Sequence, residues 1–264
     1  MRVLLTILLL LMAAPALSQS GDGGLVALQT ADDSRGWQGV GRLNMHGSGF
    51  CTAVLVTDTH VLTAAHCLFD RGTGQRIDVS RLEFLAAWRT GRAEAIRTIR
   101  SVAIWPGFDI STGAGLAAAG VDLAVLELSR AIRTTAIRPF AVTASPPQLG
   151  DEVSVVSYGR NRAEAPSIQE GCRVLERRGQ RVAIFSCQIE HGSSGAPVFA
   201  LQDGEWRVVS LISARAESDD GPVSIGVLLA GRVTDLQHSL RYPVFTASAG
   251  QSGGARTAAR FLQP

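Results

Sequence analysis

Three separated motifs carry side chains that together could perform acyl transfer by a serine. They are Thr63-Ala64-Ala65-His66-Cys67, Asp122 directly before the apolar run 123–128, and His191-Gly192-Ser193-Ser194-Gly195-Ala196-Pro197. A nucleophile, a base that takes its proton and an acid that orients the base are the minimum set for this chemistry. Alone, the serine stretch would be only a flexible turn in a chain with 28 glycines, and Asp122 only the first residue of a strand. Together they predict a triad of His66, Asp122 and Ser194.

The glycines beside Ser194 have a chemical reason to be there. Gly192 can adopt backbone angles that a side chain forbids, and its N–H and that of Ser194 are expected to form an oxyanion hole. One such donor is worth about 2.7–4 kcal/mol of barrier. For Ser193 the residue two before is His191, so Ser194 is the predicted nucleophile. Gly195 is expected to leave room for substrate and for the histidine ring.

The first residues have the features of a secretory signal. Arg2 precedes an apolar run over residues 3–12, and small residues at 16–18 form a cleavage site. We therefore expect a signal peptide over residues 1–18, too short to remain as a membrane anchor. Residues 19–36, rich in Gly, Asp, Ser and Gln, are expected to form a mobile leader or pro-segment.

Charge gives no reason to invoke a nucleic acid or an anionic membrane. The 264 residues have a formal net charge of +2, and the sequence contains no lysine. The partner we expect is a peptide or protein substrate, and the protein is expected to be a monomer.

The four cysteines indicate disulfides, because an even count behind a signal peptide is typical of an oxidising compartment. Zinc is the rival, but no cysteine pair has the close spacing of a zinc site, and no metal is expected. A hairpin over residues 48–63 brings Cys51 and Cys67 together and fixes the segment that carries His66. Pairing Cys172 with Cys187 would brace the loop leading to Ser194.

Short β-branched and apolar runs separated by turns predict an all-β fold. The first strand is expected over 37–43, and a short helix over 233–240. One helical turn is expected over 64–67, and an Ala/Gly loop over 111–120. We divide the chain into an N-terminal barrel at 37–140 with His66 and Asp122, a C-terminal barrel at 141–240 with Ser194, and a disordered tail at 241–264. The remaining strands are expected at 48–56, 60–63, 81–88, 95–104, 123–128, 152–158, 172–176, 181–187, 198–201, 205–213 and 223–229.

The order His66, Asp122, Ser194, with these flanking residues, resembles the chymotrypsin/trypsin-like serine proteases. The resemblance covers roughly residues 37–240 and is greatest to bacterial secreted members, including the glutamyl endopeptidase (V8-like) branch. It implies two antiparallel six-stranded β-barrels with the active site in the cleft between them. It also implies that Ser194 attacks, His66 shuttles the proton and Asp122 holds the ring, with no cofactor.

The chain departs from this family at two places. Ser193 stands where many animal relatives carry an aspartate that pairs with a new N-terminal amine after zymogen cleavage. At the specificity pocket, Gln188 replaces the aspartate that selects Arg or Lys. Ile212 replaces the histidine of glutamyl-specific relatives, so that specificity is in doubt. The pocket is expected to be lined by Gln188, Ser213, Ala214 and Arg215, of which Arg215 either attracts an acidic side chain or is simply solvated.

Two functions follow from the sequence. The first is a secreted or periplasmic serine endopeptidase that works through an acyl-enzyme. The alternative is a catalytically inactive protease-fold binding protein of the cell envelope. Inactive relatives usually lose a triad residue, and this chain retains all three, which favours the enzyme.

Overall fold

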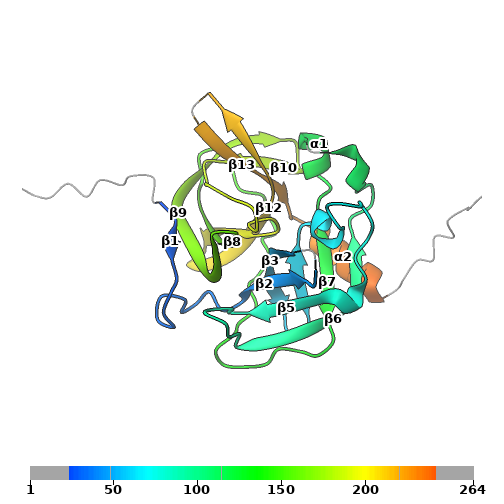
Figure 1. Ribbon diagram of the computed structural model, residues 1–264. Helices are drawn as coiled ribbons and strands as arrows, with labels where there is room; N and C mark the ends of the chain where they lie inside the picture. Colours follow the sequence, from blue (N-terminus) through cyan, green and yellow to red (C-terminus); the bar gives the residue numbers. More distant parts are fainter. Residues whose placement is uncertain (1–23, 48, 114, 220, 242–264) are drawn as a thin grey trace, which may run out of the picture.

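A computed structural model describes residues 24–47, 49–113, 115–219 and 221–241. The expected signal peptide at 1–18 and the expected tail beyond Arg241 lie outside these residues. The described chain forms two sets of antiparallel strands that face each other across a junction (Figure 1).

The first set is a closed six-stranded barrel in the order β2-β3-β4-β7-β6-β5. Its strands are rich in aliphatic and β-branched residues, which suit a pleated, half-buried surface. Leu43, Leu55 and Phe84 are fully buried inside it. The strands are β2 (Val40–Met45), β3 (Gly49–Thr57), β4 (His60–Thr63), β5 (Leu82–Ala86), β6 (Ala95–Ile104) and β7 (Ala124–Leu128).

The second set also closes on itself. Its strands pair in the order β8-β9-β10-β13-β12-β11, and β11 pairs with β8 to close the circuit. The expected two-barrel, chymotrypsin-like fold is therefore confirmed. The strands are β8 (Glu152–Gly159), β9 (Arg162–Arg178), β10 (Val182–Phe185), β11 (Pro197–Gln202), β12 (Glu205–Ser218) and β13 (Gly221–Leu228).

An apolar layer joins the two barrels. Val54 and Leu62 of the first barrel pack in one buried cluster with Tyr158 and Phe199 of the second. Because buried side chains are packed as densely as organic crystals, this layer fixes how the two barrels face each other. Any site built from both barrels inherits that fixed geometry.

Strand β9 is longer than the sequence predicted, since it begins at Arg162 and not at Cys172. The unpredicted part of the strand contains Pro166, and a proline cannot donate to a sheet ladder. The structure places Pro166 inside the strand, where its carbonyl accepts a hydrogen bond from the amide of Leu28 at 2.8 Å. Beyond Cys172 the strand runs through the expected segment 172–176.

The expectation of a mobile leader is wrong for residues 24–36. Strand β1 (Val26–Ala27) pairs antiparallel with β9, opposite Ser167 and Ile168. Leu28 is buried, and Trp37 stacks against Phe140. The segment therefore forms part of the folded second barrel.

Short helices lie at the ends of strands. The expected helical turn is the 3₁₀ helix η1 (Ala65–Leu68), and the expected C-terminal helix is α2 (Arg232–Arg241). The stretch 111–120, expected to be a loop, contains α1 (Leu116–Ala119) and the end of the 3₁₀ helix η3 (Ile110–Thr112). A further 3₁₀ helix, η2, covers Val79–Arg81. None of the helices in the described part is long and apolar enough to cross a membrane.

The cysteines pair as the sequence predicted. Cys51 is bonded to Cys67 and Cys172 to Cys187, with Cα–Cα separations of 6.2 Å and 5.1 Å. Cys51 and Cys67 also lie close to His66, but a disulfide sulfur is not a thiolate and does not serve as a ligand in a zinc site.

Replacing both members of either pair by alanine should lower the free energy of unfolding by about 3 kcal/mol, because the two bonds close loops of similar length. The residues of each pair are 16 and 15 positions apart. Urea unfolding of C51A/C67A and C172A/C187A measures the effect. A loss below about 1 kcal/mol in either variant would contradict this entropic account.

Candidate active site

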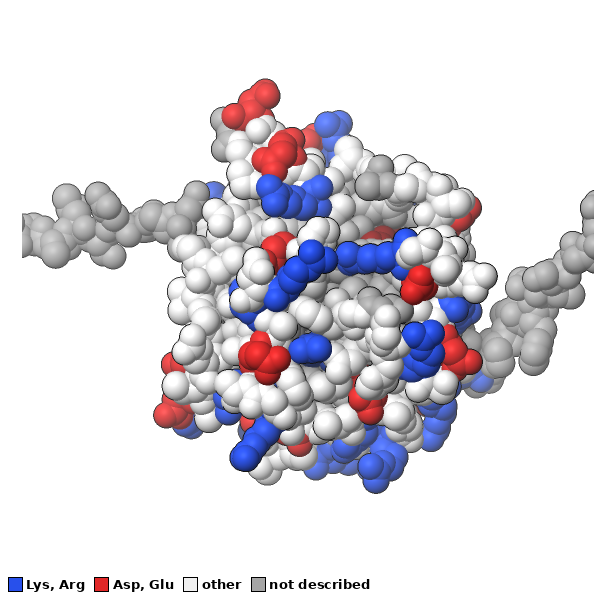
Figure 2. All heavy atoms as spheres, in the orientation of Figure 1, with Lys and Arg blue, Asp and Glu red and all other residues white. Residues whose placement is uncertain are grey.

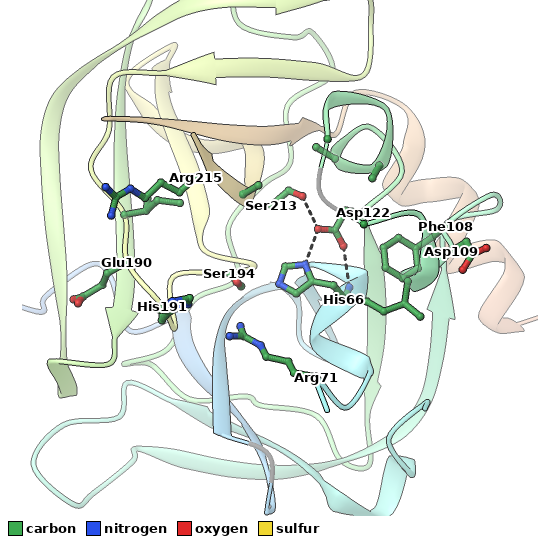
Figure 3. Close-up of a pocket in the computed structure, with 17 residues that line it drawn as sticks. His66, Arg71, Phe108, Asp109, Asp122, Glu190, His191, Ser194, Ser213 and Arg215 are labelled. Atoms are coloured by element: carbon green, nitrogen blue, oxygen red, sulfur yellow. Dashed lines mark hydrogen bonds and ion pairs between the residues drawn. The ribbon is translucent and has the colours of Figure 1, made fainter. Parts of the chain in front are cut away.

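The three predicted site residues come from three different elements that meet where the barrels face each other. Strand β4 ends at Thr63 and leads into η1, which carries His66. Asp122 lies two residues before β7, and Ser194 lies in the turn before β11. Figure 3 shows the three side chains around one cleft.

Asp122 is held by three hydrogen-bond donors. Its Oδ2 lies 2.7 Å from Nδ1 of His66 and accepts the hydroxyl of Ser213 at 2.6 Å. Its Oδ1 accepts the backbone amide of His66 at 2.9 Å. The carboxylate side chain is only 4% exposed. An ionised carboxylate only accepts hydrogen bonds, so this arrangement assigns the ring proton to Nδ1 and leaves Nε2 as a base.

Ser194 lines the same cleft as His66. Its side chain is partly exposed, whereas Ser193 is fully buried and turned away into the second barrel. The Ser193 hydroxyl lies 3.2 Å from the carbonyl oxygen of Tyr158. No hydrogen bond joins Ser194 to His66 within the described structure, and such bonds are often long before substrate binds.

The two amides expected to form the oxyanion hole are free. Neither the N–H of Gly192 nor that of Ser194 donates a hydrogen bond to any described residue. Gly192 has a φ of +100°, and a Cβ there would lie 2.6 Å from Cε2 of Phe50. A residue with a side chain is therefore excluded at this position by both strain and contact.

Gly195 has a different role from the one the sequence suggested. A Cβ at this position would lie 2.1 Å from Oγ1 of Thr63 and 2.5 Å from the carbonyl oxygen of Thr52. These atoms belong to β4 and β3, on the side of the first barrel. Gly195 thus allows close contact between the barrels, and the histidine ring is not among its nearest neighbours.

Thr52 connects the barrels and was missed by sequence reasoning. Its amide donates to the carbonyl of Ser194 at 2.9 Å, and its hydroxyl donates to the carbonyl of Gly192 at 2.9 Å. The same hydroxyl accepts the amide of Tyr158 at 3.0 Å. The only sequence signal was a polar residue in an apolar strand, next to Cys51. A residue with this many partners holds the nucleophile's turn against the strands that lead to His66.

The cleft has a volume of about 500 Å³. Of the four predicted pocket residues, Ser213, Ala214 and Arg215 line it and Gln188 does not. Gln188 is exposed, and its amide donates to Gln169. The Ser213 hydroxyl faces Asp122, so this side chain supports the acid. The lining residues that the sequence did not single out are Arg71, Phe108, Asp109, Ile110, Gly113, Gly115, Ala118, Ala119, Ile189, Glu190 and His191.

Most of the missed residues come from two stretches without an evident motif. Phe108, Ile110 and Ala118 come from the first stretch, of which 111–120 was expected to be a loop. Ile189 comes from the second, the segment before the serine turn. No periodic pattern marked the first stretch, so its position could be found only from the fold.

Comparison with known proteins agrees with this architecture. Residues 47–211 match the trypsin-like peptidase domain. The chain belongs to the trypsin-like peptidase family. A solved structure of a Glu endopeptidase in complex with MPD superposes with a TM-score of 0.66 at 16% identity, covering 84% of this chain and 98% of that chain. At 16% identity, the similarity to the Glu endopeptidase structure shows a shared fold and nothing more. No curated protein matches the sequence significantly.

Replacing Thr52 with valine should lower stability by about 2 kcal/mol, because buried groups of Gly192 and Tyr158 lose their partner. Peptide hydrolysis should slow by about tenfold or more, equivalent to about 1.4 kcal/mol of barrier. Urea unfolding and steady-state kinetics measure the two effects.

The matched control is Thr98→Val, which removes an exposed hydroxyl bonded to Ser129 at 2.9 Å. It should change stability by less than about 0.5 kcal/mol. If Thr52→Val and Thr98→Val change the free energy of unfolding and the rate of hydrolysis equally, the hydrogen bonds of Thr52 do not stabilise the contact between the barrels.

Proposed function

We propose that the protein is a serine endopeptidase that uses Ser194, His66 and Asp122 and forms an acyl-enzyme. Two features of the cleft support this most. One is the hydrogen bond between His66 and the buried carboxylate of Asp122, and the other is the pair of amides of Gly192 and Ser194, which donate to no residue in the described part of the chain. The first prepares a base, and the second prepares a place for negative charge beside a partly exposed serine.

The proposed reaction has two halves. Nε2 of His66 takes the proton of the Ser194 hydroxyl while Oγ bonds to the peptide carbonyl carbon, and the carbonyl oxygen becomes negatively charged between the two amides. His66 then gives its proton to the leaving nitrogen, the C–N bond breaks and the acyl-enzyme remains. A water molecule repeats the sequence, with His66 as its base, and releases Ser194 and the acid product.

The cleft supports a peptide or protein as substrate. Its wall is largely apolar, with Phe108, Ile110, Ala118 and Ile189 facing the space near Ser194. The glutamyl preference in the name of the structural neighbour is not extended to this chain. Ile212 is fully buried, and Arg215 forms an ion pair with Glu217, so neither offers a dedicated carboxylate site.

We propose an extracellular or periplasmic location, a monomeric state and no partner other than the substrate. The two disulfides support an oxidising compartment. Basic and acidic side chains are interspersed with uncharged ones on the face that Figure 2 shows. A mixed surface of this kind does not favour nucleic acid or an anionic membrane.

The assignment of the nucleophile can be tested with two single variants. Ser194→Ala should lose peptide hydrolysis by several orders of magnitude and should not react with a serine-directed phosphonate. Ser193→Ala should still be labelled and should lose about tenfold or less in rate, because this buried hydroxyl does not reach the cleft. Mass spectrometry of the labelled protein and a fluorogenic peptide library measure both effects.

Labelling of Ser194→Ala but not of Ser193→Ala would reverse the assignment. If the unmodified protein is neither labelled nor active, the alternative of a binding protein without turnover is favoured.

A further inference from the structure

An ion pair between Glu190 and Arg162 of β9 holds the turn that carries the free amides. We call residues 190–194 the oxyanion loop. Within it, the amide of Ser193 donates to the carbonyl of Glu190 at 3.0 Å, which closes the turn. The Ser193 hydroxyl lies 3.2 Å from Nη2 of Arg162, at the start of β9. Ser193, at one end of this turn, therefore contacts the first residue of β9.

Arg162 contacts both ends of that turn. Its Nε lies 2.7 Å from Oε1 of Glu190, and its Nη2 donates to the hydroxyls of Ser157 at 2.9 Å and Ser193 at 3.2 Å. Its Nη1 donates to the carbonyl of Ser157. The side chain is only 15% exposed. Burial lowers the pKa of the guanidinium and Glu190 opposes this, and arginine stays charged at any pH of interest.

The carboxylate of Glu190, the partner of Arg162, is also held by close packing. A Cβ on Gly159 would lie 2.1 Å from Oε1 of Glu190, so this carboxylate rests directly on the backbone of β8. Next to it, the amide of Arg160 donates to the carbonyl of His191 at 2.7 Å. The oxyanion loop is thus held against the β8–β9 end by this backbone bond and by the Arg162 side chain. Two further contacts add to these: Nδ2 of Asn161 donates to Oε2 of Glu190 at 3.2 Å, and the Ser193 hydroxyl lies 3.2 Å from the carbonyl oxygen of Tyr158.

We propose that Arg162 is the positioning residue that holds the oxyanion loop in the conformation with both amides free. This inference rests on the proposed function. In relatives with an aspartate before the nucleophile, a liberated amine makes the corresponding ion pair. Here a guanidinium supplied by β9 acts on Glu190 and on the hydroxyl of Ser193. The loop is ordered without a cleavage-generated terminus.

The fork geometry explains why the residue is arginine. A planar guanidinium reaches a carboxylate, a carbonyl and two hydroxyls at once, whereas a lysine ammonium is a single point of charge. Without the guanidinium, Glu190 loses its charged partner and keeps the hydrogen bond that Nδ2 of Asn161 donates to its Oε2 at 3.2 Å. The His191–Gly192 peptide then keeps the bond from the amide of Arg160 to the carbonyl of His191 but loses the support of the Arg162 side chain. With a φ of +100° at Gly192, this peptide can rotate and turn the Gly192 amide away from the cleft.

The test is Arg162→Met in the full chain, with kcat and KM for a peptide substrate and hydrogen exchange of the segment 188–195. Losing one oxyanion donor costs about 10²–10³ in kcat. We expect kcat to fall by about 10²-fold, KM to change by less than about threefold (under 1 kcal/mol), and exchange in the segment to accelerate. Binding of a peptide boronate should weaken in parallel with kcat, because it uses the same two amides.

Arg177→Met is the matched control, since Arg177 also lies on β9 and is half-buried, but the hydrogen bond that it donates, to Gln148 at 3.0 Å, is exposed to solvent. It should leave kcat and exchange unchanged. If Arg162→Met does not fold, Glu190→Gln tests the same ion pair without removing volume, and its kcat should fall by about tenfold.

The proposal is overturned if the folded Arg162→Met variant, or Glu190→Gln in its place, keeps the kcat and the exchange rate of the unmodified protein. If the unmodified protein does not cleave peptides, the proposed function fails, and hydrogen exchange alone then decides the role of Arg162.

Discussion

The hydrogen bonds of Thr52 are the constraint on which the rest of the site depends. One buried residue of the first barrel binds the carbonyls of Gly192 and Ser194, while its hydroxyl also accepts the amide of Tyr158. Its neighbour Cys51 is bonded to Cys67, next to His66. The position of Ser194 relative to His66 is therefore set by the contacts of two adjacent residues of β3, Cys51 and Thr52.

The two barrels contribute different parts of the chemistry. The first supplies His66 and Asp122 on segments held by β4 and β7, and the second supplies Ser194 and the free amides. The second barrel also supplies Ser213, which donates to the carboxylate of Asp122 across the junction. Because groups from both barrels meet at Asp122 and at the oxyanion loop, a shift of one barrel would disturb both the base and the anion site.

Much of the fold could be predicted from the sequence, because alternating and β-branched runs report local strand formation. The strands 60–63 and 95–104 were found this way. The pairing of β1 with β9 could not be found, because two residues are too few to show an alternating apolar pattern. The partner strand also lies far along the chain. The first half of β9, which contains Pro166, was also missed. Whether a strand can contain a proline depends on whether a neighbouring strand needs a backbone N–H at that position, and the sequence does not show this.

For the site, the motifs gave the residues that we propose perform the chemistry, and they missed those that hold these residues in place. Arg162 and Thr52 act through long-range contacts that leave no spacing rule in the sequence. Gln188 was misplaced because counting back from Ser194 assumes that the intervening turn has the family's shape. Gly195 was identified correctly as an obligatory glycine, but the neighbour that requires it is Thr63 and not the histidine ring.

The central claim is that Ser194 attacks while the amides of Gly192 and Ser194 bind the resulting oxyanion. A crystal structure of the protein with a peptide boronate tests this most directly. We predict a bond from Ser194 Oγ to boron and one boronate oxygen at about 2.7–3.1 Å from both amide nitrogens. A boronate bonded to Ser193, or an adduct on Ser194 whose oxygens contact neither amide, would contradict the account.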